Sequence, residues 1–300
     1  MKTIFEGVAT ALTTPFTSNG IDYERFEKRI ERQLNAKVDA LVFMGTTGES
    51  PTITHHERRT IIEFAVSRLK GKIPIIIGTG SNCTQTACEM TNEAKALGAD
   101  CALIVTPYYN RCEQDGLILH YSEISKTCKF PYIVYNVPKR TGVNVEPTTA
   151  LRILSDGYAF GLKEANTNLN HVYTTLNLVA KTHPVYCGAD ELTSVFLKNG
   201  ARGTISVASN VIPSKIKEYI SDFESNYENH NNMLEPYFSE FFNLLSTKVN
   251  PIPIKCIESI LYQEPCIFRL PLSTPTSDYF EYLKATLNKL NITDQKETIC

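Results

Sequence analysis

A lysine near the middle of the chain has surroundings that suggest chemistry. Lys163 closes the apolar run FGLKEAN (160–166), and Glu164 follows it directly. A lysine is almost never fully buried unless a partner or a reaction requires it. An internal ion pair with Glu164 is the alternative, but neighbouring residues of a strand point to opposite faces. Because burial disfavours a charged amine, a lysine in this position is a candidate Schiff-base former.

Polar side chains follow other apolar runs in the same way. Tyr135 stands near the end of YIVYN, and its hydroxyl could carry the protons that imine formation needs. Pro138 ends that strand, since it has no N–H for a ladder. Arg140 then lies in a loop, where its planar guanidinium could hold a carboxylate with two bonds. A solvated surface charge is the alternative for Arg140.

The loop Gly45-Thr46-Thr47-Gly48-Glu49-Ser50 follows another apolar run. A plain turn is one interpretation, because glycine, threonine and serine are common turn and cap residues. However, the next helix has its own cap at Thr54. Exposed amides and hydroxyls near a helix N-terminus suit a carboxylate, so we expect this loop to bind one.

The apolar runs recur at a spacing of about 30 residues, the size of a strand–helix unit. Most are continuous rather than alternating, which is typical of strands buried on both faces. They occupy residues 7–16, 40–50, 73–82, 101–110, 132–142, 160–166, 185–191 and 203–210. Amphipathic stretches lie between them, at 23–36, 54–69 and 85–100 among others. Thr54 with Glu57 predicts a capping box, and Gly98 predicts a helix end.

Eight strand–helix units predict an α/β fold, a (β/α)8 TIM barrel, over residues 1–212. Residues 213–300 show helical patterns and no convincing strand, so we expect a C-terminal helical region there. No GxGxxG follows the first strand, which disfavours a dinucleotide-binding fold. In such barrels the site lies at the carboxyl ends of the strands, where the candidate residues stand.

Composition excludes several classes of function. The chain has 300 residues and a formal net charge of −2, which favours neither nucleic acid nor a membrane surface as a partner. No apolar stretch approaches a membrane span, and Glu6 interrupts any signal-peptide core, so we expect a cytoplasmic protein. The nine cysteines, Cys300 included, show no CxxC pair, and the six histidines show no metal motif. We expect reduced cysteines and no metal site.

Five motifs together resemble a known family. GTTGES, TPYYN, YNVPKRTG, GLKEA and GTISVASN stand in order between residues 5 and about 215, and RLPL (269–272) fits the same pattern. They are similar to the dihydrodipicolinate synthase branch of the N-acetylneuraminate lyase superfamily, which are pyruvate-dependent class I aldolases. The resemblance implies condensation of pyruvate with aspartate semialdehyde to 4-hydroxy-tetrahydrodipicolinate, on the route to diaminopimelate and lysine.

The resemblance also implies roles for single residues. Lys163 would form the imine with pyruvate, with no further cofactor, and Tyr135 would donate and accept protons. Thr46 and Thr47 would hold the pyruvate carboxylate, and the Ile205 carbonyl would line that site.

Two further roles follow from the resemblance. Thr46 and Tyr109 would complete a proton relay with Tyr135, Tyr109 reaching in from a second subunit. Arg140 would bind the carboxylate of aspartate semialdehyde. The protein would therefore be at least a homodimer, and we expect a homotetramer made of two dimers.

Other readings remain open. Sialic-acid lyases typically lack an arginine at position 140 and differ at Tyr109, but a sugar-acid aldolase of the same superfamily is a competitor. A barrel that lost catalysis and binds a metabolite is another. A phosphate-sugar enzyme would want a glycine-rich phosphate site where CGADE and SVASN stand, and the acidic pair Asp190-Glu191 does not suit phosphate.

A lysine-binding regulatory site is the last feature that the resemblance implies. The residues that match it are Ser50, His55, Asn82 and Tyr108. Thr86 stands where lysine-inhibited members have a glutamate, and Arg58 where many have a histidine. Losing a carboxylate and adding a cation both disfavour a cationic ligand, so we expect weak or absent inhibition by lysine.

Overall fold

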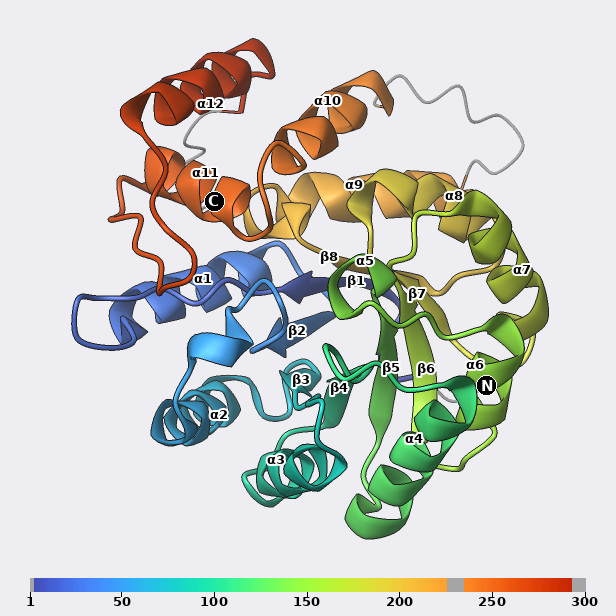
Figure 1. The fold of residues 1–300 in the computed structure, drawn as a ribbon. Coiled ribbons are helices and arrows are strands. Elements are labelled where there is room, and N and C mark those ends of the chain that lie inside the picture. The colour runs from blue at the N-terminus through green and yellow to red at the C-terminus, as the bar shows by residue number, and fades with distance from the viewer. Residues whose placement is uncertain (1–2, 226–234, 293–300) are drawn as a thin grey trace.

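Eight parallel strands surround the centre of the molecule, and each pairs with the next one along the chain. The computed structural model describes residues 3–225 and 235–292. The eighth strand pairs with the first, which closes the barrel (Figure 1). The strands are β1 (Gly7–Ala11), β2 (Ala40–Phe43), β3 (Ile75–Gly78), β4 (Cys101–Val105), β5 (Tyr132–Asn136), β6 (Ala159–Glu164), β7 (Val185–Cys187) and β8 (Gly203–Ser206). The predicted (β/α)8 barrel is confirmed.

Helices connect these strands and cover the outside of the barrel. They are α1 (Tyr23–Asn35), α2 (His55–Leu69), α3 (Thr84–Ala96), α4 (Gln114–Cys128), α5 (Pro138–Thr141), α6 (Pro147–Leu154), α7 (Leu169–Val179), α8 (Thr193–Lys198) and α9 (Pro213–Ser225). Short 3-10 turns, η1 (Ser50–Thr52), η2 (Asp190–Leu192) and η3 (Ala208–Asn210), follow β2, β7 and β8.

Two predicted helix ends are present in the structure. Thr54 caps α2 and forms a capping box with Glu57, as its spacing indicates. Gly98 follows α3 with a φ of +98°, a left-handed conformation that glycine adopts without steric cost and that commonly ends a helix.

Apolar side chains fill the barrel on both faces of its strands. One cluster, which includes Val8, Leu41, Ile75 and Ile104, packs against the surrounding helices. A second cluster, which includes Val42, Ile133, Tyr186 and Ile205, fills the interior. The Tyr186 hydroxyl donates to the carbonyl of Phe5. The packed interior therefore helps to hold the strands, and with them their carboxyl ends, in place.

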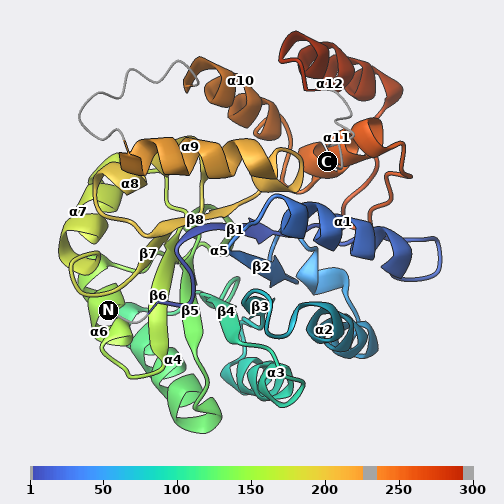
Figure 2. The same cartoon turned by 180° about the vertical axis from the view of Figure 1, so that it is seen from behind.

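Three further helices, α10 (Glu235–Leu245), α11 (Ile252–Tyr262) and α12 (Ser277–Lys289), follow the barrel. Figures 1 and 2 both show them gathered on one side, beyond α1 and α9. Buried residues of α11 and α12, such as Ile257 and Leu283, belong to the same hydrophobic cluster as the outer face of the strands. Because this core is continuous, the division of the chain at residue 212 stays a prediction.

The described cysteines are all free thiols. Cys88, Cys101, Cys128, Cys187 and Cys256 are buried, whereas Cys83 is exposed, and Cys300 lies outside the described residues. Among residues 3–225 and 235–292, no helix is long and apolar enough to cross a membrane.

Candidate active site

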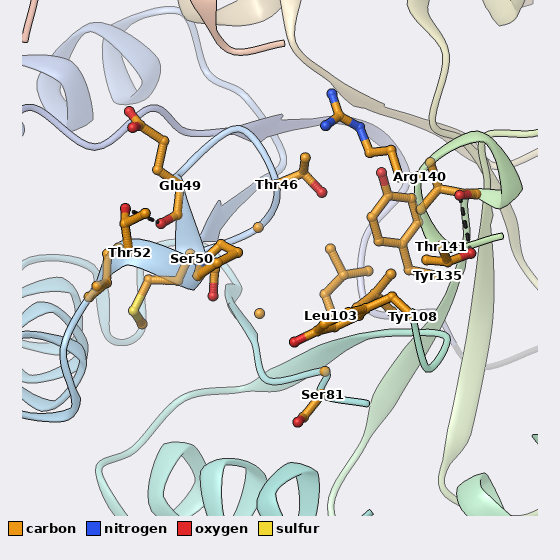
Figure 3. Close-up of a pocket in the computed structure, with 18 of the residues that line it drawn as sticks. Thr46, Glu49, Ser50, Thr52, Ser81, Leu103, Tyr108, Tyr135, Arg140 and Thr141 are labelled. Atoms are coloured by element: carbon orange, nitrogen blue, oxygen red, sulfur yellow. Dashed lines mark hydrogen bonds between the residues drawn. The ribbon is translucent and has the colours of Figure 1, made fainter. Parts of the chain in front are cut away.

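A cavity of about 530 Å³ opens where the loops after β2, β3, β4 and β5 meet the C-terminal region. Its walls include residues of the 45–50 loop, Arg58 of α2 and Thr86 of α3. Tyr108 after β4, Tyr135 of β5 and Arg140 after β5 also line it, as do Asn250 and Pro271 beyond the barrel. Figure 3 shows Thr46, Tyr135 and Arg140 around one part of this cavity and Ser50 and Ser81 around another.

The amine of Lys163 lies next to the ring of Tyr135. The two residues are paired in register on β6 and β5, so their side chains leave the sheet on the same face. Both are buried, with 5% and 6% of their surface exposed. The Lys163 Nζ is 4.4 Å from the centroid of the Tyr135 ring. The predicted amine and its predicted proton carrier are thus neighbours beside the cavity.

Gly188, which follows β7, leaves the space that the Lys163 side chain occupies. A Cβ at this position would lie 2.9 Å from the Lys163 Cε and 2.9 Å from the Cβ of Ala165. Its own N–H donates to the Glu164 carbonyl, which fixes the backbone there. Any larger residue at 188 would therefore push the lysine stem out of its position.

Glu164 does not pair with Lys163. Its carboxylate accepts from the Asn136 side chain at 2.9 Å and from the backbone N–H of Asn166 at 2.7 Å. It also forms an ion pair with His171 at 3.2 Å. Although burial opposes it, Glu164 raises the pKa of His171. This network lies on the opposite face of β6 from the lysine, as the alternation of side chains along a strand predicts.

The 45–50 loop is held in a conformation that costs backbone energy. Met44, just before the loop, and Glu49, near its end, have φ angles of +52° and +55°, which L-residues adopt only where the surroundings enforce them. The Thr14 hydroxyl donates to the Gly48 carbonyl at 2.8 Å. Asn250 donates from Nδ2 to the Thr47 Oγ1 at 3.0 Å. The Thr47 hydroxyl and the Gly48 carbonyl are therefore each held by a residue from outside the loop.

Arg140 is exposed to solvent but is not free of the protein. It lies in the short helix α5 and lines the cavity. Its Nη2 donates to the backbone carbonyl of Asn250 at 3.0 Å. This bond uses one of the five N–H donors of its guanidinium.

The structure brings together some of the predicted residues and not others. Thr46, Tyr135, Arg140, Ser50 and Tyr108 line the cavity. Thr47 is buried beside it, and Ile205 of β8 is buried in the same interior cluster as Tyr135.

Three predicted residues stay outside the cavity of a single chain. Tyr109 is 90% exposed and has a φ of +75°. His55 is mostly exposed and lies 3.7 Å from Glu93. The Asn82 carbonyl accepts from Asn110, and Asn82 is not part of the cavity wall.

The sequence alone does not indicate roles for Asn250, Gly188 and Lys255. Asn250 touches both the 45–50 loop and Arg140, and Lys255 is a buried lysine that pairs with Glu49. An Asn-Pro dipeptide and a lysine in an apolar helix are the only local signs. Within the described residues, no group of three or more His, Cys, Asp or Glu side chains is arranged to hold a metal ion.

The fold and the site define a (β/α)8 barrel with a buried lysine amine beside a buried tyrosine, near the carboxyl ends of two neighbouring strands. The model of the dihydrodipicolinate synthetase family matches residues 4–290. The chain belongs to this family.

Individual relatives align with this chain over nearly its whole length. The 4-hydroxy-tetrahydrodipicolinate synthase of Alkaliphilus oremlandii is 42% identical and covers 96% of this chain and 100% of its own. The 4-hydroxy-tetrahydrodipicolinate synthase of Kosmotoga olearia is 40% identical and covers 96% of this chain and 99% of its own. The crystal structure of dihydrodipicolinate synthase from Thermotoga maritima superposes with a TM-score of 0.93 at 36% identity, covering 96% of this chain and 99% of its own.

Proposed function

We propose that this protein condenses pyruvate with aspartate semialdehyde through an imine on Lys163. The activity is that of a 4-hydroxy-tetrahydrodipicolinate synthase, a lyase of diaminopimelate and lysine biosynthesis, and the family match over residues 4–290 supports it. A sugar-acid aldolase and an inactive metabolite-binding barrel are less well supported, since the full-length relatives carry the synthase name. We also propose that the protein works in the cytoplasm, as expected for an enzyme of amino-acid biosynthesis.

The first half of the reaction uses the Lys163–Tyr135 pair. The Thr46 and Thr47 amides and hydroxyls would hold the pyruvate carboxylate, with the Ile205 carbonyl at the other side. The neutral amine of Lys163 attacks the keto carbon, and the keto oxygen leaves as water with protons that Tyr135 supplies. Loss of a methyl proton then gives the enamine. The imine itself withdraws electrons, so this proposal requires no metal or organic cofactor.

The second half requires a grip on a small charged aldehyde. Arg140 would bind the carboxylate of aspartate semialdehyde through the donors not used by Asn250. The Asn250 Oδ1 is buried and has no protein partner among the described residues, so it could accept from the ammonium of that substrate. The enamine attacks the aldehyde carbon. The amine of the adduct then displaces Lys163, closes the six-membered ring and releases the product.

One observation supports this chemistry most directly: a buried lysine amine lies 4.4 Å from the centroid of a buried tyrosine ring beside the cavity. The test is borohydride reduction in the presence of pyruvate, followed by intact-mass and peptide mass spectrometry. We expect one pyruvate-sized adduct, on the Lys163 peptide, and none in a Lys163→Arg variant. Labelling of buried Lys255 serves as an internal control and should not occur. A folded protein that gives no adduct would contradict the proposal.

The choice of second substrate needs a separate assay. Steady-state turnover should occur with aspartate semialdehyde and pyruvate and not in the cleavage of N-acetylneuraminate. An Arg140→Ala variant should lose about 10- to 100-fold in kcat/KM for the aldehyde, the loss expected for a charged hydrogen bond. Cleavage of the sugar acid at a comparable rate would instead favour the lyase branch.

The proposed catalytic unit is at least a homodimer, and the proposed assembly is a homotetramer of two dimers. Tyr109 supports the first part, because a left-handed backbone aims a fully exposed tyrosine away from its own chain. In the proposal, Tyr109 of one chain completes the relay of Tyr135 and Thr46 in the other.

Regulation by lysine would be weak or absent. Ser50 and Tyr108 line the cavity, but His55 and Asn82 do not. The cavity wall there carries the buried Arg58, which donates to Ser50 at 3.3 Å and to the Gly78 carbonyl at 2.9 Å. A fixed cation opposes an ammonium ligand, and Thr86 offers no carboxylate. Sub-millimolar inhibition by lysine in a steady-state assay would overturn this.

A further inference from the structure

The side chain of Glu49 ends the 45–50 loop and points away from the reacting groups. Figure 3 shows its carboxylate directed away from Thr46 and Tyr135. Only 1% of that side chain is exposed, and its backbone has the left-handed φ of +55°. A buried carboxylate on a strained residue persists only when its surroundings hold both the charge and the backbone.

Lys255 of α11 is what holds the Glu49 carboxylate. The two side chains form an ion pair in which 3% of the lysine and 1% of the glutamate are exposed. The ammonium also donates to the Ile267 carbonyl at 2.8 Å. The rings of Phe16 and Phe268 lie 4.4 Å and 4.8 Å from its nitrogen. Lys255 thus joins the loop after β1, the loop after β2 and the loop after α11.

Stability alone is a weak reason for such a pair. Removing two charges from water is costly, and apolar residues of similar volume often replace a buried ion pair without loss of stability. Burial is also the largest influence on Lys255 and lowers its pKa. Apolar residues cannot reproduce the directionality of the ion pair. A lysine that also donates to a second acceptor fixes where the carboxylate, and with it the loop, must lie.

We propose that Lys255 is a positioning residue for the carboxylate-binding loop and acts through Glu49. By holding the last residues of the loop, it sets the direction of the Thr46 and Thr47 amides toward the pyruvate carboxylate. This inference rests on the proposed function, since it takes that loop as the pyruvate site. It gives the C-terminal region a part in binding pyruvate without any contact between Lys255 and the substrate.

The test compares single and paired substitutions. Lys255→Met and Glu49→Gln each leave one buried charge unpaired, so each should lower the melting temperature. The double variant Lys255→Met/Glu49→Gln has no unpaired charge and should recover most of that loss. If the pair positions the loop, the double variant should still show a pyruvate KM raised about 10- to 100-fold, the effect of a small misplacement of binding groups. Its KM for aspartate semialdehyde should be unchanged.

A matched control exists one turn along the same helix. Glu258 of α11 and Arg29 of α1 form a comparably buried pair, with 1% and 4% exposed. Their further partners, Thr13 for Glu258 and Glu264 for Arg29, also lie outside the 45–50 loop, and Glu264 keeps a contact with Arg32. Arg29→Met/Glu258→Gln should leave the pyruvate KM unchanged. A double Lys255/Glu49 variant with normal pyruvate KM, or a control variant with an equal rise, would refute the positioning role.

Borohydride trapping separates this failure from failure of the proposed function. If the wild-type protein forms the Lys163 adduct at saturating pyruvate and the double variant has a normal KM, only the positioning role is wrong. If the wild type forms no adduct, the proposed function and this inference both fail. If a single variant does not fold, the double variant still provides the comparison, because its charges are removed together.

Discussion

At the scale of single residues, Gly188 decides whether the lysine can reach its working position. A Cβ at 188 would meet the Lys163 Cε at 2.9 Å, closer than side-chain carbons approach in packed proteins. We predict that Gly188→Ala lowers the rate of pyruvate trapping by about 100-fold, since a displacement of about 1 Å can have that effect. The measurement is single-turnover reduction with borohydride.

A second glycine provides the control for this prediction. Gly157 has no atom within 4 Å of an added Cβ, so Gly157→Ala should trap pyruvate at the wild-type rate. Equal rates for Gly188→Ala and the wild type would show that the lysine stem can move aside at no cost to its reaction.

The residues that could be predicted from the sequence share one property. Lys163, Tyr135 and Thr46 each stand at or just after the end of an apolar run, and a parallel barrel brings the ends of such runs together. Asn250 and Lys255 could not be predicted, because they lie 203 and 206 residues from their partners in the 45–50 loop. Their local signs, an Asn-Pro dipeptide and a lysine within an apolar helix, do not reveal which residues they contact.

At the scale of elements, strands and long helices could be predicted because periodicity and caps are local. The Thr54–Glu57 box that starts α2 is an example. What the sequence could not show is that Glu57 has a second partner. Arg269, in the segment after α11, donates to both carboxylate oxygens and to the Thr52 carbonyl. This contact attaches the C-terminal region to the start of α2.

The Glu57–Arg269 contact predicts a dependence of stability on pH. Hydrogen bonding from Arg269 lowers the pKa of Glu57 from 4.5 to about 2. Because the pKa is lower in the folded state, the stabilisation is complete above about pH 5 and is lost as the pH falls toward 2. The Arg269 contact should contribute on the order of 1 kcal/mol, less than the full shift in pKa implies, because the pair is partly exposed to solvent and Thr54 supplies some of the hydrogen bonds.

Urea denaturation of the wild type and Arg269→Met across that pH range would measure this contribution. The variant should be less stable near neutral pH, and the difference should shrink as the pH approaches 2. Lys284→Met is the matched control, because Lys284 and Glu281 form an exposed pair on α12 whose loss should have little effect at any pH. A constant difference between wild type and Arg269→Met would contradict the assignment.

At the scale of the whole molecule, exposed apolar residues indicate candidate contacts between chains, which the periodicity of one sequence does not reveal. Leu169 and Tyr173 are 43% and 41% exposed and stand four residues apart on α7, so they share one face of that helix. In Figures 1 and 2, α7 lies on the opposite side of the barrel from α2. An exposed apolar pair on a wall helix is a candidate contact between two dimers.

We therefore predict that Leu169→Glu/Tyr173→Glu converts the proposed tetramer into a dimer. Charges placed in an apolar contact are costly to bury, and Tyr109 lies in the loop after β4, away in sequence from α7. Sedimentation velocity should show half the wild-type mass, and kcat should stay within about twofold, since surface substitutions away from a site have small effects.

Leu119→Glu, at a leucine of α4 that is 70% exposed, should remain a tetramer. A double variant that stays tetrameric would place the contact between dimers elsewhere. A double variant that dissociates into inactive monomers would show that α7 also contributes to the contact between the two chains of the dimer proposed for Tyr109.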